Sequence, residues 1–220
     1  MTSRRYAHAG PLYDLLSFER LLYRRPRERL LAMLGPLPGA TVVDVGCGTG
    51  RNLGGLRELV GPHGRIIGID ASTSMLRRAR RRAKAAGWAN VRLVEGHAEN
   101  LLAALTGAGS PVDDPENADN VDVIIATFVL SIVDDQRAFW TAVDHLGTAR
   151  PLRVALADLG AATRASTLTR LALDQLVRLG GSDLHARPWE QLAARSNDVA
   201  HEIEHGGHVH LAVGSVGPLA

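Results

Sequence analysis

Residues 42–50, with the sequence VVDVGCGTG, constrain the fold of this chain more than any other stretch. The valines are β-branched, which is typical of a parallel strand that is covered on both faces. Gly46, Gly48 and Gly50 then allow the backbone to turn sharply and to approach a ligand, because no Cβ stands in the way. The spacing differs from the dinucleotide pattern G-x-G-x-x-G, since Arg51 stands where that pattern has its third glycine, and no Lys-Ser/Thr pair follows as in a P-loop. The stretch predicts a buried strand that ends in a ligand-binding turn of another kind.

A second apolar stretch, residues 65–70 (RIIGID), predicts a neighbouring parallel strand that ends at Asp70. The carboxyl ends of parallel strands meet at one edge of a doubly wound sheet, so Asp70 should lie beside the glycine turn. A carboxylate at this place can accept hydrogen bonds from both ribose hydroxyls of a bound nucleoside. The two stretches together predict a nucleoside-containing ligand.

The rest of the chain continues the alternation of helices and strands. Ser72 is a predicted N-cap for a helix over 73–86, and Pro26 suits the first turn of a helix within residues 11–35. Gly206-Gly207 suits a two-residue hairpin turn. Further strands are expected at 91–94, 121–126, 152–157, 199–205 and 208–213, further helices at 51–60, 136–146 and 165–180, and a long polar loop at 103–120. This order predicts an α/β fold, a Rossmann-like, doubly wound, seven-stranded sheet with a C-terminal antiparallel β-hairpin.

Length and composition bound the class of protein. A chain of 220 residues suffices for one α/β domain and is short for two. The single cysteine, Cys47, excludes an internal disulfide, and no histidine pairs with it in the sequence to suggest a catalytic thiol. Residues 1–10 lack the apolar core of a secretory signal, and the longest apolar run, 123–133, is too short to span a bilayer. We therefore expect a cytoplasmic protein.

Asp44, the glycine turn and Asp70 together resemble the first motifs of the class I S-adenosylmethionine-dependent methyltransferases, in the manner of the type 11 and type 25 families. The resemblance covers residues 40–160 well and the two ends less well. It implies S-adenosylmethionine as the cofactor and divides the chain into an N-terminal helical lid segment (1–38) and a cofactor-binding domain (39–220). The cofactor-binding residues that it implies are Asp44, Gly46, Cys47, Gly48, Gly50, Asp70, Ala71, Met75, Gly96, His97, Ala98, Thr127 and Phe128.

The resemblance also implies a role for each group of these residues. Residues 44–50 should wrap the methionine part, Asp70 should bind the ribose, and residues 71–75 should border the adenine. His97 stands where the family has an aspartate that accepts a hydrogen bond from the adenine amino group, and a neutral imidazole can still offer an acceptor nitrogen. Thr127 and Phe128 should border the transferable methyl group.

No residue is required to be catalytic on sequence grounds. Methyl transfer is an in-line displacement on the cofactor, and a neutral amine acceptor needs no base. Candidates for moving a proton are His8, Tyr13, Asp14 and His97. All three tyrosines, at positions 6, 13 and 23, lie near the N-terminus, where they either pack a helix onto the domain or form an aromatic lid over a cationic substrate.

The methyl acceptor is the least determined part of the prediction. Residues 127–135 resemble the equivalent stretch of small bacterial methyltransferases that act on phospholipid or betaine-lipid amines. Arginines gather in residues 1–30 and 77–84, either as a solvated helix face or as a contact with an anionic membrane. We expect a small-molecule or lipid acceptor, preferably an amine, with peripheral contact at the inner membrane face.

Several alternatives stay open. The chain could bind the cofactor without catalysis, transfer the aminocarboxypropyl arm, or modify nucleic acid, although no Asn/Asp-Pro-Pro-Tyr/Phe motif or appended RNA-binding domain supports the last. Three of four histidines near the C-terminus, at positions 205, 208 and 210, could converge on a hairpin, but no carboxylate or cysteine completes a ligand set by spacing, so no metal is expected. The four histidines are His201, His205, His208 and His210. The oligomeric state is not predicted.

Overall fold

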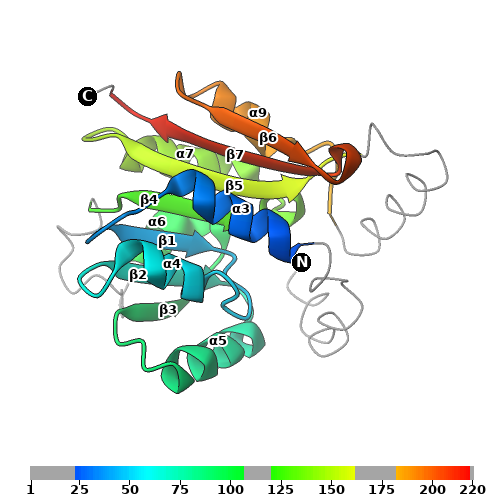
Figure 1. Ribbon diagram of the computed structural model, residues 1–220. Coiled ribbons are helices and arrows are strands. Elements are labelled where there is room, and N and C mark those ends of the chain that lie inside the picture. The colour runs from blue at the N-terminus through cyan, green and yellow to red at the C-terminus, as the bar shows by residue number, and fades with distance from the viewer. Residues whose placement is uncertain (1–22, 107–119, 162–181, 219–220) are drawn as a thin grey trace.

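The computed structural model describes residues 23–106, 120–161 and 182–218, which form a seven-stranded sheet in the order β3-β2-β1-β4-β5-β7-β6 (Figure 1). Strands β1 to β5 are parallel, and β7 is antiparallel to both β5 and β6. The bounds are β1 Thr41–Val45, β2 Arg65–Asp70, β3 Val91–Glu95, β4 Val123–Thr127, β5 Leu152–Leu159, β6 Ala200–Glu204 and β7 Val209–Val216. The predicted α/β fold, with its doubly wound sheet and C-terminal antiparallel hairpin, is confirmed.

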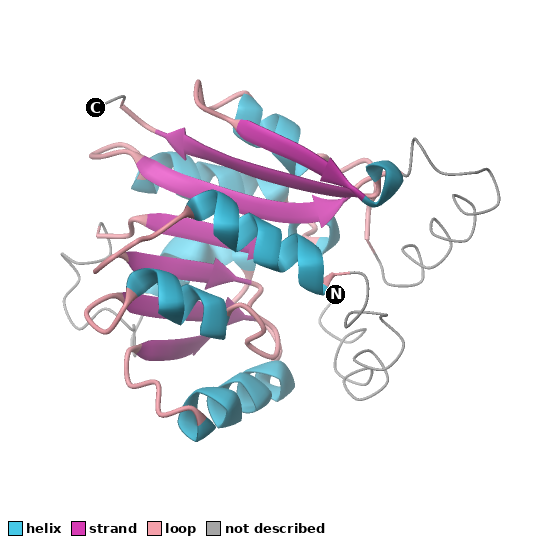
Figure 2. Ribbon diagram, in the orientation of Figure 1, coloured by secondary structure: helices cyan, strands magenta, loops and turns pink. Residues whose placement is uncertain are grey.

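Helices cover both faces of the sheet (Figure 2). One face carries α3 (Arg24–Leu34), α4 (Leu53–Val60) and α5 (Thr73–Ala85), and the other carries α6 (Leu101–Thr106), α7 (Gln136–Leu146) and α9 (Pro188–Ala193). Central strands are therefore mainly apolar, and all of β4 is buried. This double cover leaves the ends of the strands as the places where polar side chains can gather.

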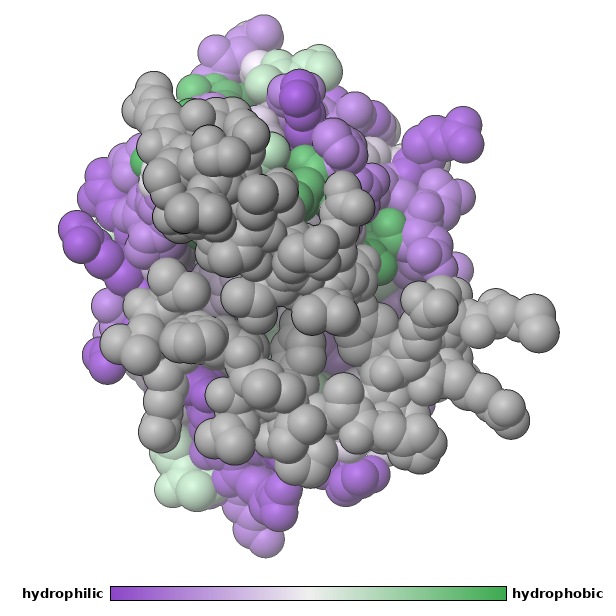
Figure 3. Space-filling view, turned by 90° about the vertical axis from the view of Figure 1, so that its right-hand side faces the viewer, coloured by the Kyte–Doolittle hydropathy of each residue, from purple (hydrophilic) through white to green (hydrophobic). Residues whose placement is uncertain are grey.

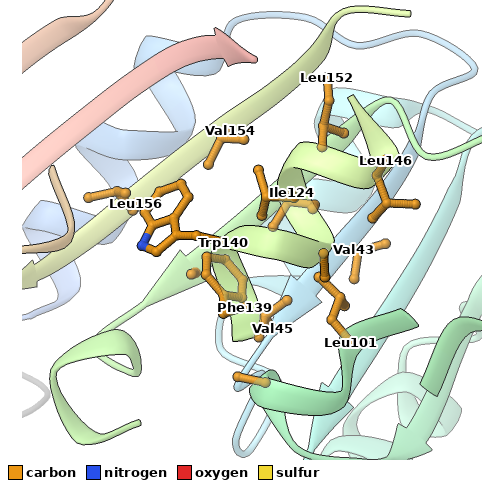
Figure 4. Close-up of a cluster of buried hydrophobic side chains, with 14 of the residues drawn as sticks. Val43, Val45, Leu101, Ile124, Phe139, Trp140, Leu146, Leu152, Val154 and Leu156 are labelled. Atoms are coloured by element: carbon orange, nitrogen blue, oxygen red, sulfur yellow. The ribbon is translucent and has the colours of Figure 1, made fainter. Parts of the chain in front are cut away.

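The core behind β4 and β5 is built around two aromatic residues of α7. Phe139 and Trp140 are buried, and their rings meet edge to face with centroids 5.2 Å apart. Figure 4 shows both rings lying against apolar side chains of β4 and β5, among them Ile124 and Leu156. Truncating an aromatic side chain in such a core costs about 3–5 kcal/mol, so this cluster fixes the positions of both strands.

Most predicted elements are found within one or two residues. The strand over 65–70 and the helix over 136–146 coincide with β2 and α7. Ser72 caps α5, where its hydroxyl accepts a hydrogen bond from the Met75 amide at 3.4 Å. Pro26 lies in the first turn of α3. The predicted helix at 165–180 and the predicted lid before residue 23 lie outside the described residues.

Two local predictions are wrong. Residues 103–106 are helical rather than part of a loop, because Leu101 and Leu105 lie one turn apart and are both buried in the core. The hairpin turn is also longer than Gly206-Gly207. Glu204 pairs with Val209, so His205 to His208 form the loop, and His205 adopts a left-handed backbone with φ of 50°. The buried ring of His208, 3.1 Å from the Gly160 carbonyl oxygen, draws the loop toward the sheet.

Candidate functional site

The glycine turn after β1 depends on the absence of side chains. Gly46, Gly48 and Gly50 all have left-handed backbones, with φ of 66°, 54° and 75°. A Cβ at Gly46 would lie 2.4 Å from Cγ2 of Val129, and one at Gly50 would lie 2.6 Å from Cδ1 of Leu53. A Cβ at Gly48, in contrast, meets no described atom within 4 Å. Two of the glycines are required by close packing, and the third leaves the turn open to an approaching ligand.

Asp70, at the end of β2, lies against this turn. Its Oδ2 accepts a hydrogen bond from the Gly48 amide at 2.8 Å, and its Oδ1 accepts one from the Ser72 amide, also at 2.8 Å. Burial raises the pKa of this carboxyl, while the two backbone hydrogen bonds and nearby His97 oppose the rise. Each oxygen keeps a further lone pair, so the carboxylate is held in place and can still accept hydrogen bonds from a ligand.

Asp44, in β1, is fully buried beside the turn. Its Oδ1 accepts a hydrogen bond from the side-chain amide of Asn52 at 3.0 Å, and its Oδ2 has no partner in the described part of the chain. Burial raises the pKa of Asp44 to about 7, although Asn52 and the positive charge of Arg27 act in the opposite direction. An ionisable oxygen without a partner at this depth is costly for a fold and indicates a place where a ligand donor can bind.

A chain of polar side chains connects Asp44 to α3. Asn52 also donates to Oγ1 of Thr127 at 3.1 Å, and the same oxygen accepts a hydrogen bond from Nη1 of Arg27 at 2.5 Å. The Arg27 guanidinium lies 4.9 Å from the centre of the Phe128 ring, and the ring of Tyr23 lies 4.5 Å from it. The structure thus brings the N-terminal helix, β4 and the glycine turn to one site.

Sequence reasoning missed Arg27 and Asn52. Asn52 had a local signal, because it stands two residues after the last glycine of the turn and directly before α4. Arg27 had none, since 100 positions separate it from Thr127 and several other arginines surround it.

Phe128 adopts a left-handed backbone, with φ of 57°, which is uncommon outside glycine. Its amide donates to the Ala157 carbonyl oxygen at 2.7 Å, and the next side chain, Val129, fills the space above Gly46. Such backbone strain is often found at functional sites. Thr127 and Phe128 therefore lie next to the glycine turn, at the edge where β1 and β4 both end.

The other predicted cofactor residues surround Asp70 or lie in the turn. Ala71 and His97 are exposed, Met75 and Gly96 are partly buried, and Ala98 is buried. The Gly96 amide donates to the Asp70 carbonyl oxygen at 3.1 Å, which brings the end of β3 to this edge. Cys47 is buried within the turn, and burial raises the pKa of its thiol well above the ordinary value. The cysteine therefore acts as a small packed residue and not as a nucleophile.

Not every acidic residue beside a strand belongs to this site. Asp122 precedes the amino end of β4, where it accepts hydrogen bonds from the Thr41 amide and from Arg150. It is therefore at the opposite edge from the glycine turn. His8, Tyr13 and Asp14 lie outside the described residues. Figure 3 shows the side toward which the parallel strands point, and the described side chains visible there are mainly hydrophilic, with small hydrophobic areas among them.

The C-terminal histidines do not gather around one point. His201 and His210 meet through Nε2 and Nδ1 at 3.0 Å, and the His210 ring stacks on Trp189 with centroids 3.7 Å apart. His208 is buried against Gly160, and His205 lies in the loop. Across residues 23–106, 120–161 and 182–218, no three histidine, cysteine or acidic side chains come together in a way that could hold a metal ion.

Comparison with known proteins identifies the family. Residues 37–150, more than half of the chain, match the model of a family described as a methyltransferase domain. The chain therefore belongs to this methyltransferase family. The predicted class I S-adenosylmethionine-dependent methyltransferase and its cofactor are confirmed at this level.

The curated relatives are similar over a limited stretch. The demethylmenaquinone methyltransferase of Geobacillus kaustophilus (strain HTA426) is 36% identical over 95 residues, which are 43% of this chain and 40% of that protein. Nocamycin O-methyltransferase of Saccharothrix syringae is 38% identical over 87 residues, 39% of this chain and 30% of that protein. The match thus spans less than half the length of either relative.

Solved structures share the fold across most of the chain. A SAM-dependent methyltransferase from Aquifex aeolicus has a TM-score of 0.56 at 18% identity, covering 86% of this chain and 89% of that chain. Geranyl diphosphate C-methyltransferase from Streptomyces coelicolor A3(2) has a TM-score of 0.59 at 14% identity, covering 87% and 76%. At these identities the likeness concerns the fold alone. Among the described helices, none combines the length and apolar character that crossing a bilayer requires.

Proposed function

We propose that this protein transfers a methyl group from S-adenosylmethionine to a small-molecule or lipid acceptor. The observation that carries the proposal is the open side of the turn at Gly48, next to an Asp70 carboxylate that is oriented by two backbone amides. This arrangement suits a ligand with a ribose and an attached charged chain. The proposal includes the division into a lid segment, 1–38, and a cofactor-binding domain, 39–220.

In this proposal the cofactor lies along the carboxyl ends of β1, β2 and β3. The methionine part follows the turn from Gly46 to Gly50, and its ammonium group is a suitable donor for the unpartnered oxygen of Asp44. Asp70 accepts the ribose hydroxyls. The adenine lies among residues that follow β2 and β3, namely Ala71, Met75, Gly96, His97 and Ala98.

Methyl transfer requires the protein mainly to align the acceptor with the cofactor. The cofactor supplies the reactive methyl group, and the chain supplies a desolvated pocket in which the acceptor is in line with it. Thr127 and Phe128, at the end of β4, border the methyl group in this arrangement. Tyr23 and Phe128 lie together near the end of β4, and aromatic side chains beside the acceptor would favour a cationic or conjugated acceptor.

The acceptor that we favour is an amine of a small molecule or lipid headgroup. The relatives are named for demethylmenaquinone, nocamycin and geranyl diphosphate, and their names specify oxygen and carbon as acceptor atoms in two cases. These names support a small organic acceptor. Methylation of an oxygen or a carbon atom is the alternative to methylation of nitrogen that the test must distinguish. The test is a comparison of lipids and metabolites in cells with and without the gene, followed by assay of compounds whose masses differ by one methylene unit.

Calorimetry tests the cofactor directly. S-adenosylmethionine should bind, and it should bind more tightly than NAD, because the turn lacks the dinucleotide spacing. Tighter binding of NAD would overturn the proposal. Product mass separates methyl transfer from transfer of the aminocarboxypropyl arm, and the complete absence of turnover of labelled cofactor in a lysate would favour a binding module without catalysis.

We also propose a peripheral contact between α5 and an anionic membrane. Arg77, Arg81 and Lys84 are exposed on this helix at a spacing that aligns them on one face. Vesicles rich in anionic lipid should co-sediment with the protein at low salt, and the R77Q/R81Q/K84Q variant should bind less. A control with the same charge removed from three separate elements, R25Q/R65Q/R137Q, should bind as the wild type does. Equal vesicle binding by the two variants would contradict the proposed membrane contact. Displacement of the protein from vesicles by RNA would indicate that the helix binds nucleic acid instead.

A further inference from the structure

Helix α3 crosses one face of the sheet and reaches the proposed cofactor site with its first turn (Figure 1). Its buried residues are Pro26, Leu30 and Leu34, and the two leucines belong to the same core cluster as Val209 and Leu211 of β7. Further along, both oxygens of Glu202 in β6 accept hydrogen bonds from Arg29. The helix is therefore anchored on the C-terminal strands, while its first turn lies at the carboxyl end of β4.

Arg27 is the residue of that first turn which enters the site. It is partly buried, donates to Oγ1 of Thr127 and lies over the ring of Phe128. Because Thr127 also accepts a hydrogen bond from Asn52, which in turn donates to Asp44, an uninterrupted chain of side chains runs from α3 to the carboxyl end of β1. Each link of this chain comes from a different element: α3, β4, the residue before α4, and β1.

The charged groups around Asp44 affect how readily its carboxyl group is ionised. The acidic side chain facing Asp44 is Asp70, which disfavours a second negative charge, and Cys47 is protonated within the same turn. Arg27 is the cation that favours the ionised form of Asp44, together with the amide of Asn52. The charge of a fully buried carboxylate thus depends on an arginine that only a docked α3 can provide.

We propose that Arg27 is a positioning residue of the cofactor site, which couples the docking of α3 to cofactor binding through Thr127, Asn52 and Asp44. This inference rests on the proposed function, since the cofactor is placed at the glycine turn. Arg27 is assigned no contact with the reacting atoms. It favours the ionised form of Asp44 and orients Thr127, so that the site is complete only when the N-terminal helix is docked.

The test compares Arg27→Met with Arg25→Met, a matched variant at an exposed position of the same helix. By calorimetry, R27M should bind S-adenosylmethionine about tenfold to hundredfold more weakly than the wild type, and R25M should bind equally well. In the cofactor-free protein, carbon-13 NMR of the Asp44 carboxyl should show a higher pKa in R27M and no change in R25M. A merely structural role of Arg27 would not move this pKa in a protein that remains folded.

Two further variants keep the test decisive if R27M does not fold. R27K retains the charge and should keep the pKa of Asp44 close to that of the wild type, while affinity falls less than in R27M. T127V breaks the hydrogen-bonded chain without removing a charge, and it should weaken binding as well. If the wild type binds the cofactor and both R27M and T127V bind it equally well with an unchanged Asp44 pKa, this inference is wrong while the proposed function stands. Failure of the wild type to bind would overturn both.

Discussion

The sheet can be divided into a first half, strands β1 to β4, and a second half, strands β5 to β7. Both halves carry a buried aspartate at the same edge, but the two aspartates differ in their hydrogen bonds. At the end of β1, Asp44 leaves one oxygen without a partner in the described chain, and Gly48 leaves an open side. At the end of β5, Asp158 is equally buried, yet its two oxygens accept hydrogen bonds from the Ser131 amide at 3.0 Å and the Leu159 amide at 2.8 Å. Asp44 therefore has bonding capacity to spare, whereas Asp158 uses its capacity internally.

The histidines of β6 and β7 extend this contrast. The His210 ring is stacked on Trp189, and its two nitrogens face Nε2 of His201 and the Gly207 carbonyl oxygen. Polar groups with internal partners stabilise a fold, while a buried group without one at a strand end points to a ligand only when other observations, such as the open side at Gly48, agree with it. The comparison teaches that a polar cluster near a strand end indicates function only after its internal hydrogen bonds have been counted.

The largest expected effect concerns the stability of the second half. Trp189→Ala should lower the free energy of unfolding by about 3–5 kcal/mol, because it removes a buried indole and the stacking surface of His210. Urea unfolding measures the loss, and calorimetry at a temperature where the variant is folded should show unchanged affinity for S-adenosylmethionine. W189F, which keeps an aromatic ring, should lose less. Weakened cofactor affinity in W189A would break the comparison, since the second half would then contribute to binding.

The next effect concerns binding in the first half. Asp70→Ala should weaken S-adenosylmethionine binding by about tenfold to hundredfold, because a buried ribose would lose its acceptor and the Gly48 amide would lose its partner. The matched variant is D158A, which removes a buried carboxylate from the other half and should cost stability while leaving affinity unchanged. Equal losses of affinity in the two variants would contradict the assignment of the site to β1 and β2.

His210 and Asp44 should contribute to the pH dependence of stability with opposite signs. Burial and His201 lower the pKa of His210 from 6.5 to about 4, so the unfolded chain binds its proton first and stability falls as the pH drops from about 6.5 to about 4. Burial raises the pKa of Asp44 from 3.8 to about 7, so the unfolded chain loses its proton first and stability falls as the pH rises from about 4 to about 7. Urea unfolding in small pH steps measures both slopes.

Two variants separate these slopes. H210F keeps the stack on Trp189 but does not titrate, so its stability should fall more steeply than that of the wild type as the pH rises through this window. D44N removes the contribution of Asp44, so its stability should fall less steeply than that of the wild type as the pH rises. Because His210 is only partly buried, its contribution should be the smaller of the two. Slopes that are the same in H210F, D44N and the wild type would show that neither group titrates as described.

The smallest effect should come from the exposed ion pair between α3 and β6. Arg29 and Glu202 join α3 to β6 at the surface, where solvent screens the pair. R29Q should leave the thermal midpoint and the cofactor affinity close to those of the wild type. A clear loss of affinity in R29Q would show that cofactor binding depends on the anchoring of α3 to the C-terminal strands.

The sequence by itself determined the fold class, the order of elements and the position of the glycine turn. Local patterns carry this information, because β-branched runs define buried strands, glycines permit left-handed backbones, and acids at strand ends come together at one edge of a parallel sheet. Asp44, Asp70 and the three glycines could be named for this reason. The sequence also determined the helix over 136–146, whose spacing of apolar residues is unambiguous.

Only the tertiary structure decided which side chains meet across long distances in the chain. Arg27 reaches Thr127, Tyr23 reaches Phe128, and Asp158 holds the Ser131 amide, none of which any local pattern specifies. The same holds for the hairpin, where the buried ring of His208 makes the turn longer than its glycines predict. Turn propensities act over a few residues, whereas burial and hydrogen bonding of an individual side chain depend on elements that are brought together only when the sheet is complete.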